Sequence, residues 1–245
     1  MDNENRNAYR SSRPECIQIK QIGGSMAQNY QSNQNQDKTK DSMSNHEKFV
    51  EQGRMLFLEY DQEELLKKYP LDHDDTYLYI NFCGRPYRID RRDGRIYNAA
   101  GSPAGFGATM TIYDMITRSP HPPVPTGKWA TMTDLLAKCS GVGPASLEMF
   151  ARDFRCFEGH VEQLQEACLK AGGRLVKGGD VSCIFPVFDN FDIWFQFWDS
   201  DDEFPSSISF LWDDCAIDHL HYETLWYVMR DILVILRRIM EGSLA

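Results

Sequence analysis

The chain has 245 residues, of which 42% are hydrophobic, and its formal net charge is −10. This length suffices for one domain with a sizeable core plus a tail. No apolar run approaches the roughly 18 residues that span a bilayer, so an integral membrane protein is excluded and a cytoplasmic protein is expected. The seven cysteines form no C-x-x-C pair and follow no signal peptide. That pattern argues against a secreted disulfide scaffold and against a zinc site made only of cysteines.

Negative charge is concentrated in residues 180–223, which contain eleven acidic residues and no Lys or Arg. The first 45 residues carry six basic and five acidic residues, so the tail is not its source. An acidic segment of this kind does not suit a cationic nucleic-acid surface.

Residues 1–44 are predicted to be a disordered polar tail, because they are rich in Asn, Gln and Ser and contain few aliphatic side chains. The sequence leaves open whether translation begins at Met1, Met26 or Met43. Residues 45–245 are predicted to form a single α+β domain, with antiparallel β-meanders, flanking helices and a long C-terminal helix.

The expected elements follow from hydrophobic periodicity and from glycine and proline breaks. One or two amphipathic helices precede Pro70, and three short strands follow, separated by glycine turns. A helix and a proline-rich loop come next, then two or three helices, four strands and a last helix. Strand 191–198 is apolar at successive positions, so we expect a central strand covered on both faces. The expected ranges are 46–68, 77–82, 85–90, 95–98, 105–117, 131–171, 174–177, 181–188, 191–198, 207–212 and 222–240.

An acidic loop joins the last two predicted strands. Asp199, Asp201, Asp202 and Glu203 lie within five residues and follow Trp198. The spacing does not fit an EF-hand, which needs a glycine and a carboxylate where this loop has phenylalanines. An aromatic ring beside carboxylates suits a cationic ligand or partner, and the alternative is a solvated hairpin without a binding role.

Two basic segments are further candidates for binding. Arg85 and Arg88 lie on the second predicted strand, where they can bind an anion or pair at long range with the acidic segment. Lys128 and Trp129 follow the proline-rich loop, and Trp129 is expected either to anchor that loop through its apolar surface or to act in recognition.

His219, His221 and Glu223 lie where the last strand gives way to the last helix. Histidines at alternate positions of an extended chain point the same way, and a carboxylate can complete a three-ligand metal site with an open position. The alternative is structural, because a negative charge in the first turn of a helix is favoured by the helix dipole.

Signals for other chemistry are weak. Residues 135–147 resemble the hairpin of helix-hairpin-helix DNA-binding modules through the Gly141-Val142-Gly143-Pro144 turn, but few basic residues surround it and a plain turn explains it equally well. Gly105 and Gly107 lack the third glycine of a dinucleotide-binding motif. No nucleophile elbow or catalytic-cysteine signature is present.

From about His46 to Met240, the order of features resembles domain of unknown function thirty-seven eighty-six (DUF3786), a family of anaerobic bacteria and archaea. The resemblance rests on segments 84–89, 125–129, 172–173, 195–198, 201–205 and 210–213 and on Glu223. It implies a cytoplasmic α+β module that is sometimes fused to iron–sulfur domains, and hence an association with anaerobic redox or one-carbon metabolism. It carries over no catalytic residue, and this sequence contains no iron–sulfur cluster motif.

The leading hypothesis from the sequence is a non-catalytic accessory protein that binds an unidentified protein or small-molecule ligand. The second is a metal-dependent enzyme that uses the His219 and His221 region with the acidic loop. Nucleic-acid binding through residues 135–147 ranks third, no cofactor is identified, and no membrane partner is expected.

Overall fold

A computed structural model describes residues 44–139 and 146–243, all of which fall within one compact unit, Met43–Ala245. The predicted tail 1–44 lies almost entirely outside the described residues. The described part of the chain has an α+β fold with two antiparallel sheets, as the sequence predicts. None of its helices is both long enough and apolar enough to cross a membrane.

The smaller sheet contains three strands in the order β1 (Tyr77–Phe82), β2 (Arg85–Asp90) and β3 (Ile96–Asn98). Cys83 and Gly84, which join β1 to β2, both have positive φ angles, of 48° and 69°. Positive φ at both central residues defines the type I′ turn, whose twist matches that of the flanking strands.

The larger sheet has five strands in the order β4-β8-β7-β6-β5, and every neighbouring pair is antiparallel. Strand β7 is central, as predicted. Strand β4 lies between the proline-rich loop and the first helix after it, and the sequence does not predict it because three residues are too few to show a periodicity. The bounds are β4 (Trp129–Thr131), β5 (Arg174–Leu175), β6 (Val181–Phe188), β7 (Phe191–Trp198) and β8 (Ser207–Asp213).

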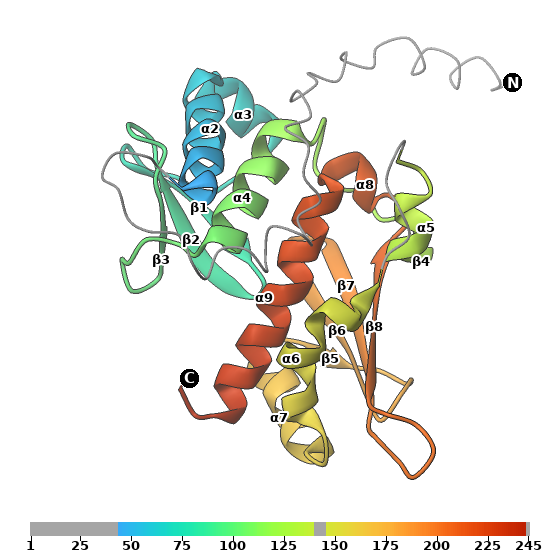
Figure 1. Cartoon of the computed structure of the whole chain (residues 1–245). Helices are drawn as coiled ribbons and strands as arrows, with labels where there is room; N and C mark the ends of the chain where they lie inside the picture. The colour runs from blue at the N-terminus through green and yellow to red at the C-terminus, as the bar shows by residue number, and fades with distance from the viewer. Residues whose placement is uncertain (1–43, 140–145, 244–245) are drawn as a thin grey trace, which may run out of the picture. The chain divides into compact units, whose positions relative to one another are not determined.

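The helices gather on one side of the larger sheet, and α9 runs across that face (Figure 1). Helix α9 has the bounds that its apolar periodicity predicts, whereas α8 ends at His219, where the sequence predicts extended chain. The α-helices are α2 (Asn45–Glu59), α3 (Gln62–Lys68), α4 (Phe106–Arg118), α5 (Met132–Leu136), α6 (Ala151–Phe154), α7 (Val161–Lys170), α8 (Ala216–His219) and α9 (Tyr222–Met240), and the 3₁₀-helices are η2 (Leu147–Phe150) and η3 (Arg155–Phe157).

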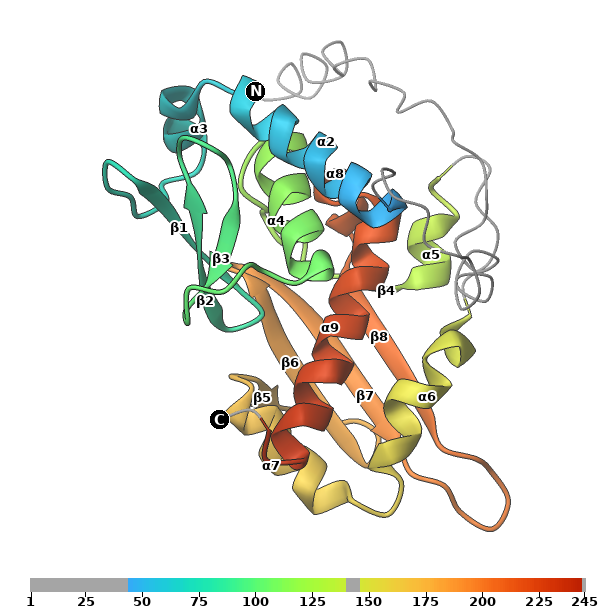
Figure 2. The same cartoon turned by 60° about the vertical axis from the view of Figure 1, so that its left-hand side comes forward.

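Burial alternates along the central strand, and this corrects the expectation that both of its faces are covered. Phe191, Ile193, Phe195 and Phe197 point toward the helices and are completely buried. The residues between them are only half-buried, and Trp198 is exposed. No helix of the described residues covers this second face, which we call the outer face (Figure 2). The fold is therefore two-layered at the larger sheet.

The two sheets meet at the turn between β1 and β2. The Cys83 N–H donates to the Val187 carbonyl of β6 at 3.0 Å. Val187 lies in the irregularity of β6 between Pro186 and Phe188, where the register with β7 shifts. Proline has no N–H to donate, and a bulge is where a strand tolerates it. The bulge thus turns one carbonyl of β6 toward the smaller sheet.

Candidate functional site

Three tryptophans lie on the outer face of the larger sheet, and we call them the tryptophan face. Trp129 of β4 pairs with Asp213 of β8, while Trp194 and Trp198 of β7 pair with Leu211 and Ser207. Paired residues point to the same side of a sheet and alternate residues share a face, so all three indoles project from the helix-free side. Trp129 and Trp198 are each 39% exposed.

The tryptophan face combines aromatic rings with hydrogen-bonding groups. The rings of Trp129 and Trp194 meet edge to face, with centroids 5.6 Å apart. The Trp194 Nε1–H donates to Ser182 Oγ at 2.7 Å, which fixes the orientation of that indole. Gln196 and Leu211 are half-buried beside them. Half-exposed tryptophan with nearby polar groups is typical of recognition surfaces.

The Asp213 carboxylate holds the segment that presents Trp129. It accepts hydrogen bonds from the backbone N–H groups of Thr126, Gly127 and Cys215, at 3.0, 2.9 and 3.1 Å. Burial alone raises the pKa of Asp213, but the hydrogen bonds from Cys215, Thr126 and Gly127 outweigh it and lower the pKa to about 2. The carboxylate is therefore ionised at neutral pH, and it ties the proline-rich loop to the end of β8.

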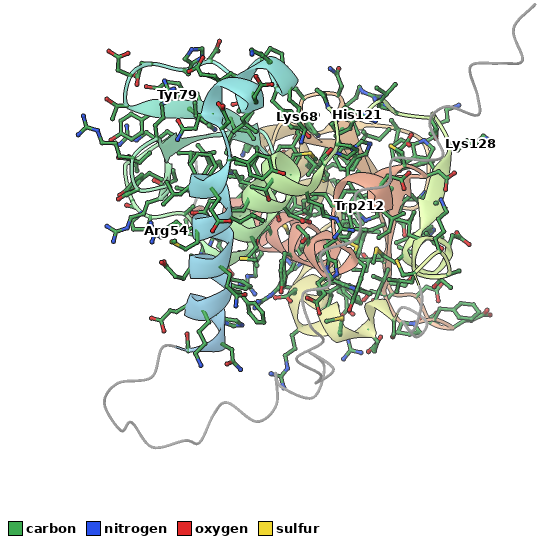
Figure 3. The ribbon with its side chains drawn as sticks, turned by 90° about the horizontal axis from the view of Figure 1, so that it is seen from above. Arg54, Lys68, Tyr79, His121, Lys128 and Trp212 are labelled. Atoms are coloured by element: carbon green, nitrogen blue, oxygen red, sulfur yellow. The ribbon has the colours of Figure 1, made fainter. Side chains whose placement is uncertain are left out.

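Lys128 and Trp129 are both exposed to solvent. Lys128 is exposed, and its carbonyl accepts from the Asp214 N–H at 2.8 Å. Figure 3 shows Lys128 at the periphery of the molecule, whereas Trp212 of β8, the strand that pairs with β4, lies inside it. Of the two roles expected for Trp129, its exposure favours recognition over anchoring.

The loop between β7 and β8, residues 199–206, is the acidic hairpin, and it extends beyond the ends of the other strands (Figures 1 and 2). Two of its carboxylates have partners within the chain. Asp199 accepts from the Gly159 N–H at 2.9 Å. Asp201 accepts from the N–H groups of Glu203 and Phe204, at 2.8 and 2.7 Å, and these bonds lower its pKa.

The tip of the acidic hairpin is open to solvent. Asp202 and Glu203 are exposed, and the Phe204 side chain is 66% exposed. The hairpin therefore contains two carboxylates that shape it and two that face outward beside an uncovered aromatic ring. Together with the adjacent Trp198, these are groups that suit a partner carrying both cationic and apolar side chains.

Arg85 and Arg88 lie on β2 of the smaller sheet. The Arg88 guanidinium stacks over the Tyr77 ring at 4.8 Å, and its buried Nε has no hydrogen-bond partner among the described residues. Their neighbours Arg91 and Arg95 pair with Glu63 and Asp93, outside the acidic segment. The structure does not bring these arginines to the tryptophan face.

His219, His221 and Glu223 are not assembled as a set of metal ligands. In residues 44–139 and 146–243, no group of three or more His, Cys, Asp or Glu side chains is arranged to hold a metal ion. His219 is buried and its Nδ1 lies 2.7 Å from Ser119 Oγ. His221 is the N-cap residue of α9, and its Nδ1 accepts from the Glu223 N–H at 3.3 Å.

Both histidines are held neutral by their surroundings. Burial lowers the pKa of His219, and the nearby His121 lowers it further. Burial and the charge of Arg118 lower the pKa of His221 to about 4. The Ser119 hydroxyl donates to the His121 carbonyl at 2.7 Å, so it can only accept from His219, whose Nδ1 must carry the proton. Both histidines are therefore engaged in hydrogen bonds within the chain.

The predicted DNA-binding hairpin at 135–147 is only partly visible, because residues 140–145 lie outside the described residues. Leu135 and Leu136 of α5 are buried in the core. Trp194 is the member of the tryptophan face that the sequence does not single out, because it lies in a strand that is apolar at successive positions. The alternation of burial becomes evident only once β7 is paired with β6 and β8.

The chain was compared with curated proteins, solved structures and family models, and the family models agree with the resemblance seen in the sequence. Neither the curated proteins nor the solved structures contain a match to the chain. A family model does match, over residues 61–234, which include the tryptophan face and the acidic hairpin. The chain therefore belongs to the family described as Domain of unknown function (DUF3786).

Proposed function

We propose that this protein is an accessory protein that binds a partner protein through the tryptophan face. The observation that carries the proposal is the display of Trp129, Trp194 and Trp198 on a sheet face that no helix of the described residues covers. Tryptophan is among the residues that contribute most to binding energy at protein interfaces. The exposed tip of the acidic hairpin, next to Trp198, adds charge that can select the partner.

The form of the site favours a protein over a small molecule. The exposed groups are spread over β4, β8 and β7, which are successive strands about 4.8 Å apart. A cavity of about 200 Å³ does occur in the described residues, but it lies elsewhere and is lined by Cys156, His160, Gln163, Arg237, Met240 and Glu241. A role in anaerobic redox or one-carbon metabolism is the part of the proposal that rests on the family resemblance alone.

Site-specific photo-cross-linking in the native cell tests the proposal. A photoreactive residue replaces Thr131, which is exposed on the outer face, or Glu162, which is exposed on α7 and serves as the control. We expect cross-links to a defined protein from position 131 and not from position 162. The absence of a product specific to position 131 would contradict the proposal.

Affinity of the purified cross-linked protein then tests the individual side chains. Trp129→Ala and Trp198→Ala should each weaken binding by about tenfold or more, as expected for central interface tryptophans. Met149→Ala is the matched control, because Met149 is 60% exposed and lies on η2. Unchanged affinity in both tryptophan variants would remove the face as the binding site.

A further inference from the structure

A cavity of about 200 Å³ lies away from the tryptophan face, where the C-terminal end of α9 lies beside α7 (Figure 1). It is smaller than the roughly 300–1,000 Å³ of sites for drug-sized ligands, so its size suits a small molecule. Two segments of the chain form its walls. The C-terminal end of α9 contributes Arg237, Met240 and Glu241, and the segment from η3 to the first turn of α7 contributes Cys156, His160 and Gln163.

The cavity contains one cationic and one anionic side chain, and both remain available to a ligand. The Arg237 guanidinium lies 3.6 Å from the Asp153 carboxylate and 3.9 Å from that of Glu241, and both distances are longer than a hydrogen bond. Within the part of the chain that the structure describes, neither the Arg237 nor the Glu241 side chain forms a hydrogen bond. An ion of one sign is attracted by one of these groups and repelled by the other, whereas a zwitterion matches both.

Neutral side chains add hydrogen-bonding groups to the walls. His160 Nδ1 lies 2.6 Å from the Glu158 carbonyl, which can only accept, so Nδ1 carries the proton and Nε2 of the neutral ring is an acceptor. The Gln163 side chain is exposed and offers both a donor and an acceptor. The Cys156 thiol donates to the Asp153 carbonyl at 3.3 Å. With the Met240 thioether it gives the cavity a weakly polar wall, which suits a short aliphatic group.

The two helix ends at the cavity have opposite polarity. No side chain caps the N-terminus of α7, which begins at Val161 directly after His160. The N–H groups at such an end and the positive end of the helix dipole favour a carboxylate. Helix α9 ends at Met240, and the negative end of its dipole favours a cation. The helix ends therefore have the same separation of charge as Arg237 and Glu241.

We propose that this cavity binds a small free α-amino acid. The ligand carboxylate lies against Arg237 and the first turn of α7. Its ammonium group donates to Glu241 and to His160 Nε2, and its side chain packs on Met240. Such a site for a small molecule goes beyond the proposed function, because it lies apart from the tryptophan face and requires no partner protein.

Isothermal titration calorimetry of the full-length protein tests the proposal with L-serine and L-valine as probes. We expect at least one of them to bind, and three analogues test which groups are recognised. Isovalerate is valine without its amino group, isobutylamine is valine without its carboxylate, and glycine betaine is a zwitterion without N–H donors. Each analogue should bind at least about tenfold more weakly than the amino acid. Equal binding of any analogue would contradict recognition of an α-amino acid.

Charge variants with matched controls locate the site. Arg237→Gln and Glu241→Gln should each weaken binding of the amino acid about tenfold. The controls are Arg238→Gln and Glu162→Gln, which remove the same charges from exposed side chains of α9 and α7 outside the cavity. They should bind as the wild type does, and circular dichroism checks that every variant is folded.

Two results would overturn the proposal. The first is that neither amino acid binds at concentrations up to about 10 mM, well above a Kd of about 1 mM, which corresponds to a binding free energy of only about −4 kcal/mol. The second is that the cavity variants bind no more weakly than their controls. The analogues are measured on the unaltered protein, so the proposal can still be contradicted if a variant fails to fold.

Discussion

At the scale of the residue, the carboxylate of Asp213 holds the proline-rich loop in place. Asp213 accepts three backbone N–H groups, and replacing it by asparagine removes the charge and leaves one acceptor oxygen. We expect Asp213→Asn to lower the free energy of unfolding by about 2 kcal/mol at pH 7, the usual effect of losing hydrogen bonds to a charged acceptor. Because the pKa of Asp213 is lowered to about 2, its contribution is present above its ordinary value of 3.8 and is lost as the pH falls toward 2.

Urea denaturation at pH 7 and at pH 3 measures this effect. The difference between wild type and Asp213→Asn should be smaller at the lower pH. A difference that does not change with pH would show that the loop is held by packing rather than by the charge.

The pKa of Asp231, on α9, is shifted in the opposite direction to that of Asp213. Burial raises its pKa to about 6, although Arg230 and Arg238 act to lower it. The carboxylate lies against α4, where a Cβ on Gly107 would collide with Asp231 Oδ2. Since the native state holds this proton more tightly than the unfolded chain, ionisation of Asp231 costs stability as the pH rises through about 6.

Asp231→Asn should therefore be more stable than wild type at pH 7.5, by up to about 3 kcal/mol. The gain should disappear as the pH falls well below the ordinary value of 3.8, where the aspartic acid is neutral in both states. Thermal unfolding of the two proteins across this pH range is the measurement. If Asp231→Asn is the less stable protein at pH 7.5, the ionised carboxylate must accept hydrogen bonds that asparagine cannot replace.

At the scale of the element, the carboxylates of the acidic hairpin differ in how much each contributes to stability. Replacing Asp201 and Asp202 by asparagine should change the melting temperature by less than about 2 °C, because an asparagine oxygen at 201 still accepts from Glu203 and Phe204. Asp199→Ala should lower it by about 4 °C, since Gly159 loses its acceptor. Differential scanning calorimetry distinguishes the two, and a large loss in the double variant would show that the charge of Asp201 or Asp202 is needed for the structure of the hairpin.

How much of the fold can be predicted from the sequence depends on the length of each element. Helix α9 is predictable to its bounds because its apolar stripe covers five turns and His221 caps it. Strand β4 and helix α8 are too short for any periodicity to appear, and both are fixed by distant partners, β8 and α4. The candidate site was predictable in part: Trp129, Trp198 and the hairpin stand out by local composition. Trp194 does not, because only strand pairing reveals which face of β7 is open.

For the whole molecule, the buried core is built from residues that follow the polar tail. Phe57 of α2 is the first fully buried side chain of the described residues. Deleting residues 1–43 should therefore leave the melting temperature unchanged within about 2 °C, because this segment offers too few apolar side chains to join a core. Calorimetry of the truncated and full-length proteins checks this, and a large drop in melting temperature would contradict it.

The position of α9 in the chain has a consequence for synthesis. The five-stranded sheet is complete in sequence at Asp213, but the helix that covers its apolar face extends to Met240. During translation the phenylalanines of β7 and β8 thus leave the ribosome before α9, although Phe157, on which Phe197 packs, precedes them. Strands with exposed apolar faces are prone to aggregate until the helix packs on them. We therefore expect the nascent chain to depend on chaperones most strongly between the emergence of β7 and the docking of α9.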